Sequence, residues 1–358
     1  MTEGPFRTAI LGASGYVGQH FARLLATHPA FAEPELVAGD RSVGRRLEDV
    51  WVLDEPIPPG LAAQRLGAAS PSRVAAGGVE VVFGAMPTGR AGPVETELSR
   101  RGVAVFTNAA DHRRDRGVPL LIPEVNPDHL QLLDRRPAGR APIVTNPNCT
   151  ATGLALGLAP VWELLAPRAV LVSTYQARSG AGVAGLRSTA FTDNVVPYIA
   201  DEEEKVAWET TALLGRRRGG GVVRPNVSVV VQAARVPVRD GHLEAVTVVA
   251  GNDPTERQIL RAWRTFDPLV RLPLPTAPHP PIVLRPEPDR PQPRLDVGTG
   301  SPVRARGMAV VIGRVRWSPP FLRFFLLSHN AVRGGAGGSV LNAEFALAAG
   351  ALPHRRDG

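Results

Sequence analysis

A single thiol and a distant histidine are the side chains best suited to covalent chemistry. Cys149 is the only cysteine among 358 residues, and it lies in "TNPNCT", between an apolar run and a stretch typical of a helix. A thiolate is a strong nucleophile, and the N-terminus of a helix favours its formation. His242, in "RDGHLEA", is a candidate acid or base for that thiol. Taken singly, each has an ordinary alternative: a small buried apolar side chain for Cys149 and a structural histidine for His242.

A glycine-rich turn near the start of the chain indicates a nucleotide. Gly12, Gly15 and Gly18 have the spacing G-x-x-G-x-x-G between a β-like run and an amphipathic helix. Such a turn lets the backbone approach a pyrophosphate at the N-terminus of the helix. The alternative is a tight strand–helix turn without a ligand. The following strand, "PELVAGD", leads into Arg41 and Ser42, which suit a 2′-phosphate and therefore favour NADP.

The one lysine of the chain is a further candidate. Lysine and arginine together number 41, and only Lys205 is a lysine. A position that keeps lysine in so arginine-rich a chain can require a compact ammonium group, although chance is the alternative. The net charge of +8 comes mainly from scattered arginines that are not interleaved with aromatic residues. That pattern favours a phosphate-bearing small molecule over a nucleic acid.

Composition sets the broad class. The hydrophobic fraction of 44% and charged fraction of 21% are typical of a soluble globular protein, and the length favours two domains. One cysteine excludes an internal disulfide and a cysteine-based metal site, so we expect a cytoplasmic protein without a metal. The opening residues lack the pattern of a signal peptide, and no apolar run reaches the roughly 18 residues that span a bilayer.

Strand and helix patterns divide the chain in two. In the first half, the runs "VEVVFGAMP", "VAVFTN" and "APIVTN" alternate with helix-like segments, which predicts a parallel sheet with ligands at the carboxyl ends of its strands. The second half has alternating β-rich runs that predict a mixed or antiparallel sheet. We expect loops at 215–221 and at 271–293, where nine prolines occur, and a helix in "GGSVLNAEFALAAGAL".

Seven segments in order resemble aspartate-β-semialdehyde dehydrogenase, in its archaeal and fungal branch. They are "LGASGYVG", "NPNCT", "TYQARSGAG", "NVVPYIADEEEKVAWET", "RVPVRDGHLEAV", "GMAVVIGR" and "LLSHNAVRGGAGGSVLNAE", and the likeness runs from about residue 8 to residue 348. The related reductase of arginine biosynthesis typically has "NPGC" in place of "NPNC". The resemblance implies an α/β fold with a Rossmann-type nucleotide-binding domain (1–148 with 334–358) and an α+β catalytic and dimerisation domain with a mixed sheet (149–333).

The resemblance also implies a role for each matching residue. Cys149 would be the acyl-accepting nucleophile, His242 the acid/base, Asn148 a support for the oxyanion and Gln176 an orienting group. The implied substrate-binding residues are Arg113 and Lys205 for phosphate, Arg235 for the α-carboxylate and Glu202 for the amino group. The implied cofactor-binding residues are Gly12, Ser14, Gly15, Tyr16, Val17, Gly18, Arg41, Ser42, Ser179 and Gly180. Three departures remain: Gly39 stands where a serine is expected, Arg114 competes with Arg113, and Glu203 competes with Glu202.

The implied reaction is the reversible, NADPH-dependent reductive dephosphorylation of L-aspartyl-4-phosphate to L-aspartate-4-semialdehyde through a thioacyl intermediate on Cys149. It would serve the biosynthesis of lysine, threonine and methionine. A malonyl-CoA reductase of the same fold is an alternative, and a dinucleotide-binding sensor without activity is another. Expected ligands are NADP(H), a small-molecule substrate and phosphate, with no metal, nucleic acid or membrane partner. A homodimer or a homotetramer is expected.

Overall fold

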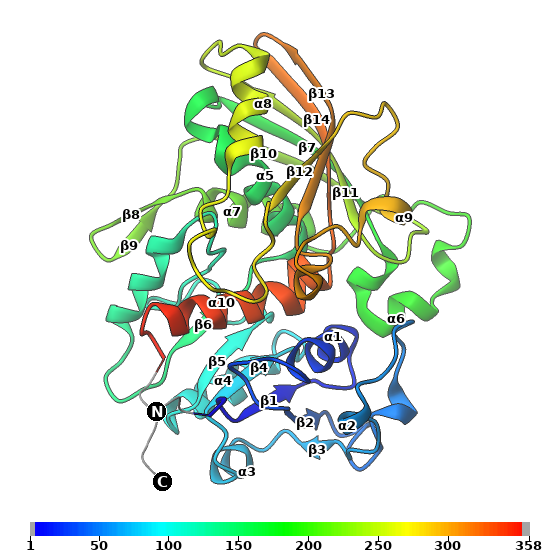
Figure 1. The fold of residues 1–358 in the computed structure, drawn as a ribbon, viewed down its shortest axis with the longest axis vertical. Coiled ribbons are helices and arrows are strands. Elements are labelled where there is room, and N and C mark those ends of the chain that lie inside the picture. The colour runs from blue at the N-terminus through cyan, green and yellow to red at the C-terminus, as the bar shows by residue number, and fades with distance from the viewer. Residues whose placement is uncertain (1–3, 353–358) are drawn as a thin grey trace. The chain divides into compact units, whose positions relative to one another are not determined.

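The computed structural model describes residues 4–352, which form two compact units (Figure 1). The first unit holds the described residues up to Leu121, the segment Asp128–Asn146 and the described residues from Ala336. The second unit holds Ile122–Pro127 and Pro147–Gly335. The chain therefore crosses between the units four times.

A six-stranded parallel sheet forms the centre of the first unit. Its strand order is β3-β2-β1-β4-β5-β6, and every neighbouring pair is parallel. The strands are β1 (Thr8–Leu11), β2 (Glu35–Ala38), β3 (Gly67–Ala68), β4 (Val81–Gly84), β5 (Ala104–Thr107) and β6 (Ile143–Thr145). Both faces of β1, β4 and β5 are buried, which explains their continuous apolar sequences. This order is that of a dinucleotide-binding fold, and it confirms the predicted Rossmann-type unit.

Helices complete the first unit. They are α1 (Tyr16–Leu25), α2 (Pro59–Ala62), α3 (Pro71–Ala76), α4 (Ala91–Arg100) and α10 (Gly337–Ala348), with 3₁₀ turns at Glu48–Val50 and Pro127–Arg135. The C-terminal helix α10 packs against α1 and β5. Its residues Val340, Ala343 and Ala346 share one apolar core with Phe21 and Phe83. The predicted helix near the C-terminus is therefore present, and its contacts with α1 and β5 lie within this unit.

The second unit is built on a mixed sheet, as predicted. Its strand order is β10-β7-β11-β14-β13-β12, with parallel pairs at its two ends and antiparallel pairs between them. The strands are β7 (Ala169–Gln176), β10 (Ser228–Arg235), β11 (His242–Val249), β12 (Ile282–Arg285), β13 (Val310–Ser318) and β14 (Phe321–Ser328). In β7 and β11, burial alternates residue by residue, so each strand has one covered and one more open face.

Helices cover one face of this sheet. The three longest are α5 (Cys149–Leu165), α7 (Glu202–Leu213) and α8 (Glu256–Thr265), and their apolar residues share a core with alternate residues of the strands. On the opposite face, Leu171, Tyr175, Val230 and Phe321 are between 39% and 54% exposed. Shorter helices are α6 (Gly182–Arg187) and α9 (Pro293–Asp296), with 3₁₀ turns at Arg178–Ala181, Thr189–Phe191 and Val303–Ala305 and a π-helical turn at Val332–Ala336.

Three sequence-based expectations about loops and strands were wrong or incomplete. The predicted loop at 215–221 contains a small antiparallel hairpin of β8 (Arg216–Arg218) and β9 (Gly221–Val223), closed by Gly219 and Gly220 with positive φ. The proline-rich segment 271–293 includes β12, which is tolerated because it is an edge strand flanked, not interrupted, by prolines. Strand β14 had not been predicted, although its outward and inward residues alternate in exposure.

Domain boundaries within the chain stay a prediction. The sequence placed them at 148/149 and 333/334, and it did not anticipate that the short segment Ile122–Pro127 groups with the second unit.

Candidate active site

Cys149 is the first residue of helix α5. Strand β6 ends at Thr145, and Asn148 caps the helix: its side-chain Oδ1 accepts hydrogen bonds from the backbone N–H groups of Thr150 (2.8 Å) and Ala151 (3.1 Å). An asparagine is among the strongest residues at this capping position. The cap fixes the start of the helix, so the thiol lies at the positive end of the helix dipole, where a thiolate is favoured.

His242 lies beside the thiol. It is the first residue of β11, it is fully buried, and its Nε2 is 3.3 Å from Cys149 Sγ. Its other ring nitrogen, Nδ1, accepts the backbone N–H of Ala177 at 3.1 Å. Because a backbone N–H can only donate, the neutral imidazole carries its proton on Nε2, facing the sulfur. Burial, and then the charge of Arg235, lower the pKa of His242 to about 3, so this neutral form is the relevant one near neutral pH.

A carboxylate–amide network lies next to this pair. Glu202, the first residue of α7, accepts hydrogen bonds from Asn148 Nδ2 (2.9 Å), Gln176 Nε2 (2.9 Å) and Thr150 Oγ1 (3.2 Å). A second carboxylate, that of Glu209, accepts the backbone N–H of Asn148 at 2.6 Å. All of these side chains are buried. The start of α7 is thus tied to the end of β7 and to the start of α5, where the thiol is.

Arg235, at the end of β10, is also buried here. Its Nη1 donates to the carbonyl oxygen of Ala177 at 2.9 Å. Burial lowers the pKa of its guanidinium, while Cys149 and Glu202 act in the opposite direction. Gly180 lies so close to both residues that a side-chain carbon there would clash with the guanidinium of Arg235 and be in tight contact with the ring of His242. A cation, a thiol and an imidazole therefore share one small region.

Lys205 stands on the first turns of α7, three residues after Glu202. Its Nζ is 3.4 Å from Asp201 Oδ2, and 41% of its side chain is exposed. The adjacent Glu203 accepts the backbone N–H of Ala233 on edge strand β10 at 2.9 Å. Of the two glutamates between which the sequence left a choice, Glu202 is therefore the one that lies in the network around Asn148 and Gln176.

The glycine-rich turn lies in the first unit, between β1 and α1. Gly12 has a φ of 87°, and a side chain there would strike the carbonyl of Ala85 at the end of β4. A side chain on Gly18 would strike the carbonyl oxygen of Gly12. Gly15 is the residue before α1, with Ser14 preceding it and Tyr16 and Val17 following it in the first turn. Close packing of turn, strand and helix is the arrangement that admits a pyrophosphate, so these residues fit a dinucleotide.

Three other predicted ligand-binding residues also lie in the first unit. Arg41 and Ser42 follow β2 in a turn in which Ser42 N–H donates to the carbonyl oxygen of Gly39 at 2.9 Å. Arg113 follows β5, and its Nη2 donates to the carbonyl oxygen of Asn108 at 2.8 Å, whereas Arg114 is exposed. All three follow the carboxyl ends of strands, where ligands bind in this fold.

Several polar residues near the site had not been identified from the sequence. Asn330 donates from Nδ2 to Ser179 Oγ (2.8 Å) and accepts from Gly241 N–H (2.9 Å), the residue before His242. Glu209 and Glu244 are the others. The sequence could have indicated Glu244. It lies two residues after His242 on a strand with alternating burial, so its carboxyl group must lie on the same buried face as His242.

Glu244 is fully buried, and neither of its oxygens has a hydrogen-bond partner. Burial, and then the charge of Glu202, raise its pKa well above 4.5. The folded protein therefore keeps a proton that the unfolded chain releases, and the stability linked to it falls as pH rises.

We expect Glu244→Gln to raise the melting temperature relative to the wild type, by a difference that grows from about pH 5 to about pH 8. Melting curves of both proteins across this range, with Glu163→Gln as an exposed control, measure the effect. A constant difference would contradict it.

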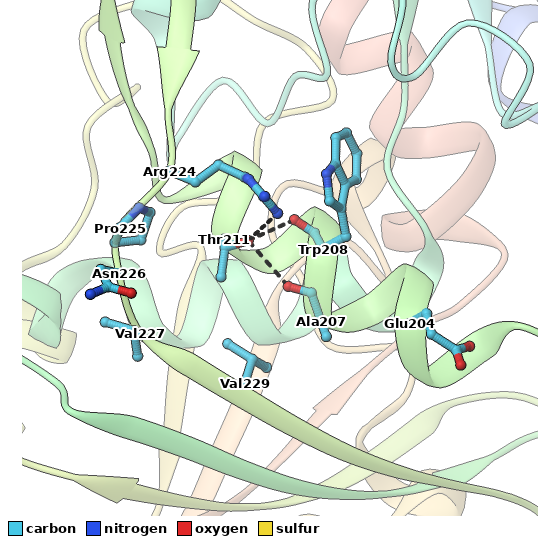
Figure 2. A pocket seen from close by; sticks show the side chains of 9 residues that line it. All are labelled: Glu204, Ala207, Trp208, Thr211, Arg224, Pro225, Asn226, Val227 and Val229. Carbon is cyan, nitrogen blue, oxygen red and sulfur yellow. Dashed lines mark hydrogen bonds between the residues drawn. The ribbon is translucent and has the colours of Figure 1, made fainter.

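A groove of about 680 Å³ lies elsewhere on the second unit, between α7 and the start of β10 (Figure 2). Arg224 and Trp208 both line this groove, and the guanidinium carbon of Arg224 lies 6.0 Å from the centre of the Trp208 ring. None of the predicted site residues lines this groove. Within residues 4–352, no set of three acidic, histidine or cysteine side chains could hold a metal ion, and no helix is long and apolar enough to cross a membrane.

A Rossmann-type unit together with a mixed-sheet unit that carries a cysteine–histidine pair defines a nucleotide-dependent oxidoreductase of two domains. Residues 7–133 match the model of the semialdehyde dehydrogenase NAD-binding domain, and residues 158–333 match that of the semialdehyde dehydrogenase dimerisation domain. The chain belongs to the semialdehyde dehydrogenase family, which confirms the resemblance seen in the sequence.

Individual relatives are similar over nearly their whole length. The aspartate-semialdehyde dehydrogenase of Archaeoglobus fulgidus is 40% identical over 348 residues, covering 96% of this chain and 98% of that protein. The malonyl CoA reductase (NADP) of Metallosphaera sedula is 36% identical over 359 residues, covering 98% and 99%. The crystal structure of aspartate semialdehyde dehydrogenase with NADP from Candida albicans superposes with a TM-score of 0.84 at 33% identity, covering 96% and 99%.

Proposed function

We propose that the protein is an NADP-dependent, phosphorylating aspartate-semialdehyde dehydrogenase. The observation that carries the proposal is the 3.3 Å pair of Cys149 Sγ and His242 Nε2 at the N-terminus of α5, with Arg235 and the Glu202–Gln176 network in the same unit. A thiol with an acid beside it and a buried cation suits a small acidic acyl substrate. The full-length similarity to the Archaeoglobus fulgidus enzyme supports the choice of substrate.

The chain's own residues define the steps. The thiolate of Cys149, favoured at the N-terminus of α5, attacks the acyl carbon of L-aspartyl-4-phosphate, the carbon–oxygen bond to phosphate breaks, and a thioacyl group remains on the sulfur. Arg235 holds the α-carboxylate as a fork, Glu202 faces the amino group, and Gln176 orients the thioacyl group. The glycine turn, with Arg41 and Ser42, would hold NADPH, which when bound would supply the hydride that reduces the thioacyl carbon. As the carbon–sulfur bond breaks, Nε2–H of His242 donates a hydrogen bond to the sulfur, which leaves as a thiolate and releases L-aspartate-4-semialdehyde.

Asn148 needs a refinement of its predicted role. Its Oδ1 and one Nδ2 hydrogen are used in capping α5 and in binding Glu202. We infer that the second amide hydrogen supports the oxyanion and that the cap itself holds Cys149 in place. Ser179 and Gly180 would border the nicotinamide, and Arg113 would assist Lys205 in binding phosphate.

The oligomeric state and biological role also belong to this proposal. The matched dimerisation domain includes the sheet whose open face carries Leu171, Tyr175, Val230 and Phe321. Apolar residues gathered on one face mark an interaction surface, so a homodimer, or a homotetramer made of dimers, is expected. Acting in the cytoplasm, the enzyme would serve the biosynthesis of lysine, threonine and methionine. Light scattering coupled to gel filtration measures the oligomeric state directly.

One assay tests the proposed reaction. Purified protein is mixed with aspartate semialdehyde, inorganic phosphate and NADP, and NADPH formation is followed by its absorbance. We expect NADPH to form only when phosphate is present.

The similarity to the Metallosphaera sedula enzyme favours malonyl-CoA reductase as a second candidate. That function requires coenzyme A in place of phosphate. Formation of NADPH from malonate semialdehyde, coenzyme A and NADP, but not from aspartate semialdehyde, phosphate and NADP, would make malonyl-CoA reductase the first candidate.

The lone lysine gives a second test of the phosphate site. Lys205→Arg keeps the positive charge but replaces a compact donor with a bulkier planar fork. We expect the KM for phosphate in the oxidative direction to rise by on the order of 10-fold, equivalent to one weakened charged hydrogen bond, with NADP affinity unchanged. Initial rates at varied phosphate measure the effect. Unchanged phosphate kinetics would remove Lys205 from the site.

A further inference from the structure

One short loop contacts Cys149 and the residue that precedes His242. This loop, residues 329–334, follows β14 and ends within the π-helical turn. Gly334 lies directly against the thiol residue: a side-chain carbon placed on it would be 2.6 Å from both Cα and Cβ of Cys149. At the other end, Asn330 accepts the backbone N–H of Gly241, next to His242. The 329–334 loop therefore contacts Cys149 directly, and it contacts Gly241, the neighbour of His242 in the chain.

A buried ion pair anchors this loop. Arg333, the neighbour of Gly334, donates from Nη1 and Nη2 to the two oxygens of Glu124 at 2.7 and 2.8 Å. Only 1% of either side chain is exposed. Glu124 belongs to the segment Ile122–Pro127, in which Asn126 Oδ1 accepts the N–H of Ile122 at 2.8 Å. The loop also closes on itself, because Gly334 N–H donates to the carbonyl oxygen of His329 at 3.0 Å.

A buried ion pair is a poor device for stability alone. Removing two charges from water costs about as much as their attraction returns, and apolar side chains of similar volume often stabilise a fold equally well. What a two-bond arginine–carboxylate fork does provide is a fixed direction and distance. The hydrogen bond from His242 Nε2 to sulfur needs a fixed direction and distance, because displacements of roughly 1 Å in a site can cost on the order of 10²-fold in rate.

We propose that Arg333 and Glu124 are positioning residues that hold Cys149 against His242 through the backbone of Gly334. The proposal rests on the role proposed above for Cys149. The same loop sets His242 from the other side through Asn330 and Gly241. The distance between sulfur and imidazole is thus fixed by one segment.

The test uses the reactivity of the only thiol. In Arg333→Lys the charge is kept and the two-bond fork is lost. We expect kcat to fall by on the order of 10-fold to 100-fold while the KM for aspartate semialdehyde changes less than about 2-fold. We also expect the rate of Cys149 alkylation by iodoacetamide, measured across pH, to fall and its pH profile to shift.

Two controls separate positioning from general destabilisation. Arg224→Lys makes the same chemical change in the same unit at the groove beside Trp208, and it should alkylate like the wild type. Ile259→Val lowers stability by deleting one buried methyl group of α8, and it should also leave the pH profile unchanged. If Arg333→Lys does not fold, Glu124→Asp, which shortens the partner by one methylene and keeps its charge, serves in its place.

The outcomes are distinct. A variant with wild-type alkylation, and with activity lost only in proportion to the unfolded fraction, would overturn the positioning role. Alkylation does not need substrate or cofactor, so the result is independent of which reaction the protein catalyses. Full activity in Cys149→Ser would instead overturn the proposed function, whatever Arg333→Lys does.

Discussion

Replacing Cys149 with serine is expected to abolish turnover. A serine hydroxyl is a far weaker nucleophile than a thiolate, and the imidazole beside it already carries its proton on Nε2, so it cannot accept the hydroxyl proton. We expect the rate of NADPH formation to fall by more than about 10⁴-fold, the usual size of losing a nucleophile. The measurement is the initial rate with aspartate semialdehyde, phosphate and NADP. The enzyme concentration must be high enough to detect the small activity that remains.

The control for this variant is cofactor binding. The glycine turn and Arg41 lie in the other unit, so the dissociation constant for NADP should be that of the wild type. A matched variant, Thr152→Ser, removes only a methyl group one turn further along α5 and should keep near-normal activity. Substantial turnover in Cys149→Ser would refute covalent catalysis by this residue. Loss of NADP binding would show that the substitution damages the fold.

Much of the first unit could be predicted because its signals are local. The runs around Ile10, Val82 and Val105 are apolar without alternation, which is typical of strands buried on both faces. Glycines at 12, 15 and 18 mark the turn that joins the first strand to its helix. Chain order together with right-handed crossovers then leaves few topologies, and the observed one is the common dinucleotide-binding order.

The second unit was harder because its pairings are distant. Strand β11 lies between β7 and β14, so residues near 170, 246 and 324 meet in space, and nothing local in the sequence states this order. The edge strand β12 was hidden among prolines for the same reason: an edge position tolerates them, but the sequence does not show which strands lie at an edge. The hairpin at 216–223 was hidden by its charged residues.

The site shows the same division. Cys149, His242, Gln176, Glu202 and Arg235 were identified by residue type and family motif, and the structure brings them together in one unit. Their supports were not identified, because support depends on partners far apart in sequence: Arg333 and Glu124 are 209 residues apart. A motif indicates which side chains react, whereas the residues that hold them can be found only from contacts.

The role of His242 is the clearest case in which geometry narrows a sequence prediction. The sequence allowed either an acid or a base. In the structure, the backbone N–H of Ala177 occupies Nδ1, and the pKa of about 3 keeps the ring neutral. A neutral ring with its proton on Nε2 donates to the sulfur and does not remove a proton from it. We therefore propose that His242 acts by donating a hydrogen bond from Nε2 to the sulfur, and not as a base.

His242→Asn is therefore expected to reduce kcat by on the order of 10²–10³-fold, the usual range for loss of one positioned donor to a developing negative charge. A group with a pKa of about 3 is neutral well above that pH. The plot of kcat against pH for the wild type should therefore show no inflection near pH 6.5 that arises from His242. The ratio of the wild-type kcat to the variant kcat should accordingly stay constant from about pH 6 to about pH 9, because any other titrating group affects both proteins equally. Profiles of kcat against pH for both proteins measure this.

Alkylation of Cys149 distinguishes hydrogen-bond donation by His242 from a role as a base. If His242 only donates, the asparagine amide, which also donates, should leave the rate of reaction with iodoacetamide within about 10-fold of the wild type while turnover falls much further. If His242 instead removes the thiol proton, alkylation and turnover should fall together, and the wild type should show a limb that the variant lacks. A change confined to KM would assign His242 to substrate binding, because a hydrogen-bond donor that acts only in the transition state alters kcat.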